Sequence, residues 1–132
     1  RTYRCSPMTL FELQETVLKY INKQEKEIPF WNLITQPYSS LEDRCKNLAK
    51  SISFSTSIEK GESVIGGGTL PDVTLESPIL LINNEKTVDT VNQLIKNDIP
   101  IIPRIIKDQV CLDLRSVFHN QDDIIVQALN NS

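Results

Sequence analysis

Histidine is almost absent from this 132-residue chain, which contains only His119. A histidine-based zinc site, a Ser-His dyad and a Cys-His dyad are therefore not expected, and the sequence predicts no metal site. The three cysteines, Cys5, Cys45 and Cys111, are odd in number and tens of residues apart. This spacing indicates neither a disulfide framework nor a CxxC metal pair. It fits a reducing, cytoplasmic location, and we expect Cys45 and Cys111 to be buried as small hydrophobic side chains.

Long apolar runs are also missing. The longest aliphatic run covers residues 79–82, which is far too short to span a membrane, and no signal peptide is recognisable. The net charge of −3 leaves the chain without an overall positive surface for nucleic acid or anionic lipid. The sequence opens at Arg1 without a methionine, so we expect it to be part of a larger protein.

Apolar residues recur at helical spacing in four stretches. Two capping-box patterns, Thr9 to Glu12 and Ser39 to Glu42, predict where the first two of these helices begin. The sequence thus predicts helices over residues 9–21, 39–52, 87–95 and 122 or 123 to 129. Residues 28–34 are predicted to be an apolar connector that packs beneath another part of the protein.

Alternating and β-branched residues predict the strands. They indicate a hairpin of residues 54–58 and 63–65, a strand over 73–82 that breaks at Pro78, and a hairpin of 101–106 and 110–114. We expect a single α+β domain over residues 1–132, with a small antiparallel or mixed sheet and helices packed on one face. Within it, a helical segment (1–52) leads into the sheet and remaining helices (53–132).

Three consecutive glycines, residues 66–68, are the most unusual local feature. They are followed by Thr69-Leu70-Pro71 and a predicted strand, so they match neither a Rossmann fingerprint nor a P-loop. By local pattern alone this segment is a structural loop. The carboxylates Asp108, Asp113, Asp122 and Asp123 do not have the spacing of a metal cage or of an acid-base pair.

Several motifs resemble those of one known family. Residues 64–71 resemble the Gly-Gly-Gly-Ser/Thr-Leu-Pro segment of bacterial selenocysteine synthases, the L-seryl-tRNA(Sec) selenium transferases. Residues 1–4 and 8–16 are similar to that family's Arg-x-x-Arg and the helix after it, and 28–35 to its Ile-Pro connector. Residues 100–105 and 112–117 resemble its Pro-Val-Ile-x-Arg-Ile and Leu-Asp-Leu-Arg-Thr-Val motifs. The resemblance covers the chain in colinear order.

The resemblance implies the C-terminal small domain of a fold-type-I pyridoxal 5'-phosphate enzyme. The family converts L-seryl-tRNA(Sec) to L-selenocysteinyl-tRNA(Sec) with selenophosphate, using a cofactor lysine in a large domain upstream. That large domain is absent here, so we expect no catalytic residue in this chain and no activity from it alone. The resemblance assigns Arg1 and Arg4 to substrate or phosphate binding, and residues Gly66, Gly67, Gly68 and Thr69 to a possible active-site loop. Arg104 and Arg115, on predicted strands, are interpreted as surface or ion-pair residues.

Two other functions remain open. The chain could belong to a related pyridoxal phosphate lyase or aldolase that never acts on tRNA. Alternatively, it could be a non-catalytic assembly module, because the family forms a homo-oligomer of dimers joined into a ring. Apolar residues in the 28–34 connector, such as Phe30 and Trp31, are the candidate contacts for such assembly. No membrane partner is expected.

Overall fold

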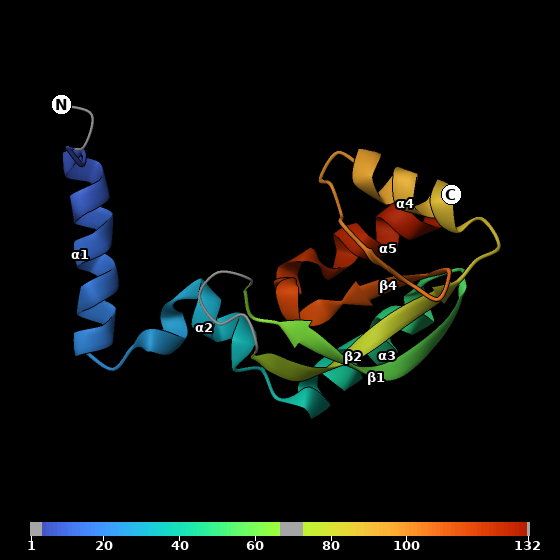
Figure 1. The fold of residues 1–132 in the computed structure, drawn as a ribbon, viewed down its shortest axis with the longest axis horizontal. Helices are drawn as coiled ribbons and strands as arrows, with labels where there is room; N and C mark the ends of the chain where they lie inside the picture. Colours follow the sequence, from blue (N-terminus) through green and yellow to red (C-terminus); the bar gives the residue numbers. More distant parts are fainter. Residues whose placement is uncertain (1–3, 67–72, 132) are drawn as a thin grey trace. The chain divides into compact units, whose positions relative to one another are not determined.

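The computed structural model describes residues 4–66 and 73–131. Arg1, Gly67, Gly68 and Thr69, four of the predicted site residues, lie outside the described residues. The chain divides into two compact units, residues 1–35 and 36–132 (Figure 1). Within the described ranges, no helix has the length and apolar character needed to cross a membrane.

The first unit contains α1 (Pro7–Ile21), a 3-10 turn η1 (Glu25–Glu27) and the short α2 (Pro29–Ile34). The predicted cap at Thr9 is wrong by three residues, because α1 begins at Pro7. Ser6 is the N-cap, and its side-chain oxygen accepts a hydrogen bond from the Thr9 backbone N–H at 3.1 Å. Proline suits the first helical position because its missing N–H would have no partner there.

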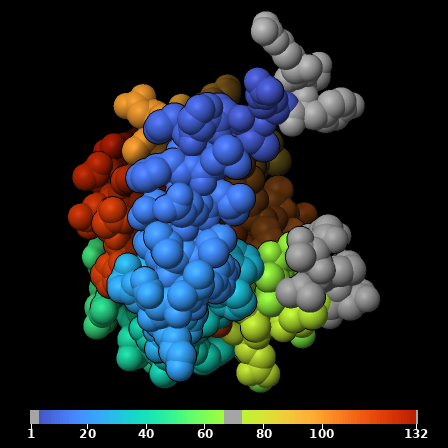
Figure 2. Space-filling view, turned by 90° about the vertical axis from the view of Figure 1, so that its left-hand side faces the viewer, coloured from blue at the N-terminus to red at the C-terminus, as the bar shows by residue number. Residues whose placement is uncertain are grey.

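The segment predicted as an apolar connector packed beneath another part of the protein forms the helix α2, and none of the α2 residues is buried in this structure. It is held to α1 by Trp31, whose indole N–H donates to the Tyr20 hydroxyl at 2.7 Å. Phe30 packs edge to face against Trp31 with the ring centroids 5.4 Å apart. Figure 2 shows α1 in blue; none of its residues is buried, and its large apolar side chains are exposed. These are Met8, Leu10, Phe11, Leu13, Val17, Leu18 and Ile21.

The second unit contains a four-stranded antiparallel sheet with the strand order β1-β2-β4-β3. Two 3-10 turns, η2 (Leu114–Ser116) and η3 (His119–Gln121), connect the last strand to the last helix. The other elements are α3 (Tyr38–Ser51), β1 (Ser55–Val64), β2 (Thr74–Asn83), α4 (Thr87–Lys96), β3 (Arg104–Ile106), β4 (Gln109–Asp113) and α5 (Asp122–Asn130).

The core of this unit lies between one face of the sheet and helices α3, α4 and α5 (Figure 1). Leu80 and Ile82 of β2 pack in this core, whereas Ile79 and Leu81, with side chains on the opposite face, form a smaller cluster with Cys111. The predicted α+β class, with helices against a small sheet, is confirmed. The fully buried members of the main core are Leu41, Cys45, Leu80, Ile82, Leu94, Val110, Leu114 and Leu129.

The predicted burial of Cys45 and Cys111 is also confirmed. Cys45 lies on the apolar stripe of α3, and burial raises the pKa of its thiol to about 12. Burial likewise raises the pKa of Cys111. Neither thiol is therefore an active nucleophile near neutral pH.

Two predicted strand boundaries are wrong. Residues 59–62 are not a turn, since β1 continues through them and pairs with β2 from Ser55↔Asn83 to Val64↔Thr74. The predicted break at Pro78 does not occur either. The ladder of β2 with β4 begins at Ile79, so β2 has a strand neighbour on one side only at Pro78. An edge position of this kind tolerates proline.

The second predicted capping box is not used. Helix α3 begins at Tyr38, one residue before Ser39, and the N-cap Pro37 has no side-chain hydrogen bond to the helix. Proline fixes an extended backbone at that position, and this ends the preceding segment and directs the chain into the helix.

Candidate functional site

Two of the residues that the resemblance assigns to a site, Arg4 and Gly66, belong to the described part of the chain, and they lie in different units. Arg4 is exposed in the first unit, two residues before the N-cap of α1. Gly66 lies in the second unit, two residues after the end of β1, and a Cβ atom added to it would meet nothing within 4 Å. The backbone before Gly66 is still paired, because the Ile65 N–H donates to the Val73 carbonyl at 3.5 Å.

A polar cluster lies at the end of the sheet from which the glycine segment departs. Its centre is the carboxylate of Asp113, the last residue of β4. This carboxylate accepts hydrogen bonds from the Ser63 hydroxyl of β1, from the Ser77 hydroxyl of β2 at 2.8 Å and from the Arg115 backbone N–H at 3.1 Å. The cluster therefore joins three strand ends through one side chain.

Arg104 of β3 completes this cluster. One of its terminal nitrogens donates to Asp113 at 3.2 Å, and the other donates to the Glu62 carbonyl of β1 at 3.0 Å. The Arg104 side chain is 43% exposed and that of Asp113 only 12%. The predicted ion-pair role of Arg104 is confirmed, and its partner is the aspartate of the Leu-Asp-Leu-Arg motif.

The prediction for Arg115 is wrong in its setting. Arg115 lies in η2 rather than on a strand and is only 6% exposed. Its terminal nitrogens donate to the Gln36 carbonyl at 2.9 Å and to the Glu76 carbonyl at 2.7 Å. A buried guanidinium that donates to backbone carbonyls holds chain segments together. Arg115 thus fastens β2 and the start of the second unit to the end of β4.

A second buried ion pair was missed by the sequence analysis. Arg44 of α3 is 6% exposed and donates to both carboxylate oxygens of Asp122, through Nε at 3.0 and 2.7 Å. It also donates to the carbonyls of Leu114 at 3.1 Å, Val117 at 2.9 Å and Phe118 at 2.9 Å. A signal was available, because Arg44 falls between Leu41 and Leu48 on the apolar stripe of its helix, where a charge requires a buried partner.

Two exposed lysines have raised pKa values. The ammonium groups of Lys46 and Lys60 pair with the carboxylates of Glu42 and Glu76, and these interactions raise the pKa of both lysines. A lysine that forms a Schiff base needs a lowered pKa, so neither of these two lysines has that character. Among residues 4–66 and 73–131, no group of three or more His, Cys, Asp or Glu side chains is placed to hold a metal ion.

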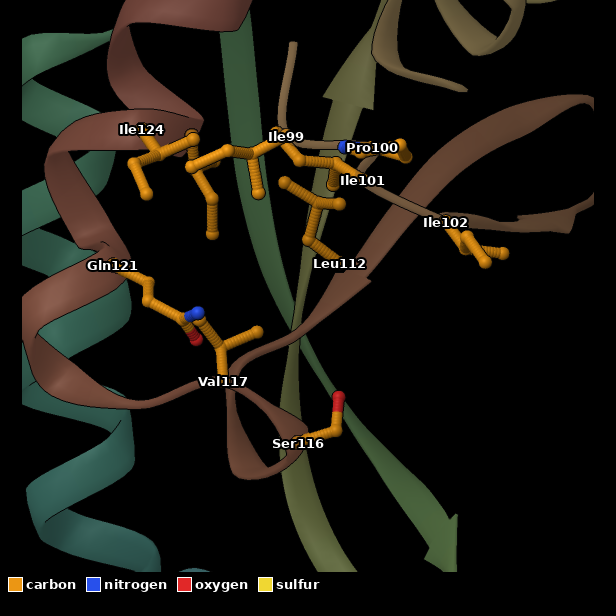
Figure 3. A pocket seen from close by; sticks show the side chains of 10 residues that line it. Ile99, Pro100, Ile101, Ile102, Leu112, Ser116, Val117, Gln121 and Ile124 are labelled. Atoms are coloured by element: carbon orange, nitrogen blue, oxygen red, sulfur yellow. The ribbon is translucent and has the colours of Figure 1, made fainter. Parts of the chain in front are cut away.

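A pocket of about 270 Å³ lies beside α5 and the segment before β3 (Figure 3). Ile99, Ile101, Val117 and Ile124 line it, and the amide of Gln121 is one of its few polar groups. None of its lining residues is charged, and none belongs to the predicted site. The pocket therefore offers mainly apolar contact, with the hydroxyl of Ser116 and the amide of Gln121 as its polar side chains.

The fold and the polar cluster define an α+β domain in which the guanidinium groups of Arg44, Arg104 and Arg115 donate to backbone carbonyls of the domain itself. Comparison with protein families assigns the domain further. Residues 1–118 match the SelA family, described as L-seryl-tRNA selenium transferase, and the chain belongs to this family.

Curated relatives agree with this assignment. An L-seryl-tRNA(Sec) selenium transferase of Clostridium perfringens strain ATCC 13124 is 32% identical over 98% of this chain. Proteins of the same name from Campylobacter jejuni strain RM1221 and Clostridium botulinum strain Hall are 28% and 30% identical over 98% and 96% of the chain. The chain spans about 30% of the length of these relatives.

Proposed function

We propose that this chain is the C-terminal domain of a selenium transferase that converts L-seryl-tRNA(Sec) to L-selenocysteinyl-tRNA(Sec) with selenophosphate. The observation that carries the proposal is the match to the SelA family over residues 1–118, together with relatives of that name aligned over nearly the whole chain. The activity belongs to the complete enzyme, a cytoplasmic homo-oligomer, and this part alone is inactive.

In this proposal the cofactor, pyridoxal 5'-phosphate, is bound by a large domain outside this chain. The proposal rests on the family match and on the chain spanning about 30% of the length of its relatives, which leaves most of such an enzyme outside this chain. When bound, the cofactor would supply the electron sink of the reaction. The residues of this chain would bind, orient and neutralise the anionic reactants.

Arg4, with Arg1, is proposed to bind the phosphate of the selenium donor or of the tRNA. Paired guanidiniums suit a tetrahedral oxyanion because each presents a fork of N–H donors. The surroundings of Arg4 support this role. It is exposed and lies just before the N-terminus of α1, whose first turn contains no acidic residue, so the local field favours an anion. The segment that begins at Gly66 is proposed to approach the same reactants.

Charge reversal tests the assignment of Arg4. We expect Arg4→Glu in the full-length protein to slow selenocysteinyl-tRNA formation by at least about tenfold, because a charge-assisted hydrogen bond is replaced by repulsion. The matched control is Lys26→Glu, which makes the same charge change at an exposed position of the same unit. Equal rates for the two variants would end the assignment. Absence of selenium transfer by the wild-type enzyme, loaded with pyridoxal phosphate, would refute the proposed function itself.

A further inference from the structure

The β1–β2 hairpin extends well beyond the rest of the sheet. Its pairing runs from Ser55↔Asn83 to Val64↔Thr74, whereas β4 pairs with β2 only from Ile79 to Ile82. The end of the hairpin therefore has two strands and no third neighbour. A two-stranded ribbon is only marginally stable in water, so other contacts must hold this end in place.

Side chains replace the missing strand at this end. The carboxylate of Asp113, the last residue of β4, accepts hydrogen bonds from the hydroxyls of Ser63 on β1 and Ser77 on β2. Arg104 then joins the same carboxylate to the Glu62 carbonyl of β1. Both hairpin strands are in this way fastened to β3 and β4, and the contacts on β1 lie at Glu62 and Ser63, four and three residues before Gly66. We call the pair Arg104 and Asp113 the hairpin latch.

The hydrogen bonds of the hairpin latch hold the side chains of Arg104 and Asp113 in one geometry. Asp113 is nearly buried, and its charge is stabilised by four donors that come from separate segments of the chain. The planar guanidinium of Arg104 reaches a carboxylate and a carbonyl at once, which the single ammonium of a lysine does not reproduce. Arg104 also offsets the negative charge of Asp113 beside the segment that the proposed function assigns to anionic reactants.

We propose that Arg104 and Asp113 are positioning residues, which fix the end of β1 and thereby hold Gly66 in place for its proposed role toward the anionic reactants. The structural half of this inference, the fixing of β1, is independent of the reaction. The functional half rests on the proposed function. The two halves therefore need separate measurements.

Hydrogen exchange of the full-length protein measures the structural half. The Ile65 N–H, bonded across the hairpin to Val73, reports the end of β1, and the amides of residues 80–82 report the centre of the sheet. We expect Arg104→Met and Asp113→Asn to speed exchange at Ile65 at least about tenfold while residues 80–82 change little. Arg104→Lys should fall between the wild type and Arg104→Met. Unchanged exchange at Ile65 in both variants would overturn the inference.

Kinetics measure the functional half. Arg104→Met is expected to raise KM for selenophosphate or for seryl-tRNA by about tenfold, with a smaller change in kcat, because a misplaced binding segment weakens capture of the substrate. The control is Asp122→Asn, which weakens the buried ion pair of Arg44 and Asp122 and should lower the melting temperature without changing KM. An unchanged KM in a variant with fast Ile65 exchange would overturn the functional half. Inactivity of the wild type would instead refute the proposed function and leave the exchange result valid.

Discussion

Removal of Asp122 gives the sharpest test of what holds the second unit together. Arg44 is 6% exposed and Asp122 13%, so truncation of the aspartate leaves a guanidinium in the interior without its counter-charge. The loss of one partner of a buried ion pair costs about 3–5 kcal/mol. The three carbonyl acceptors of Leu114, Val117 and Phe118 remain for Arg44, which favours the lower half of this range.

Urea unfolding, monitored by far-UV circular dichroism, measures this loss of stability. We expect Asp122→Ala to lower the free energy of unfolding by about 3 kcal/mol and the melting temperature by roughly 12–24 °C for a domain of this size. Arg44→Met should cost a similar amount. The double variant Arg44→Met/Asp122→Ala should lose about 2 kcal/mol less than the sum of the two single losses, because no charge is then left unpaired.

The matched control is the exposed pair of Lys46 and Glu42 on the same helix. Solvent screens this pair, so Lys46→Met should leave the urea midpoint unchanged within error. A loss below about 1 kcal/mol for Asp122→Ala, or additive losses in the double variant, would refute the reasoning that the buried pair stabilises the unit as a couple.

Two further predictions concern the stability of the second unit and the reactivity of the cysteines. Gly61→Ala should destabilise the domain by about 1–3 kcal/mol, because the new Cβ would lie 2.5 Å from Cγ1 of buried Ile79, whereas Gly66→Ala should be neutral in stability. Equal melting temperatures for the two variants would contradict this account. Cys45 should resist iodoacetamide at pH 8 while exposed Cys5 reacts, and stability should fall as pH rises from 9 to 12, because the unfolded thiol loses its proton in that range and the folded thiol keeps it. Mass spectrometry that finds equal labelling of both cysteines would exclude the burial argument.

The sequence predicted those parts of the fold that depend on apolar periodicity. The stripe of Leu41, Cys45 and Leu48 placed α3 correctly, since one buried face is a local pattern. The burial of Cys111 followed from the alternation along β4 in the same way.

The errors concern features that depend on distant partners. Pro78 breaks a strand in isolation, but it is accommodated because β4 ends before reaching it. The residues around Gly61 carry turn propensity, yet pairing with β2 keeps them extended, and the absent side chain gives room to Ile79. Arg115 was expected at the surface, since no local pattern reveals that the carbonyls of Gln36 and Glu76 would surround it.

The candidate site shows the same limit. The family motifs identified Arg104 and Asp113 as separate positions, but their ion pair could not be read from the chain. They are nine residues apart on neighbouring strands, and the shared contact with Ser63 comes from fifty residues earlier. Only the register of the sheet brings the three side chains to one end.

The division of the chain at residue 35 has a practical consequence for production of the domain. Every member of the main core lies between Leu41 and Leu129, and α1 contributes no buried residue. A protease that cuts in the polar stretch between α1 and α2 should therefore leave a resistant fragment with its interior intact. Such a trimmed fragment, free of the apolar surface of α1, is the form of this domain best suited to spectroscopy and crystallisation.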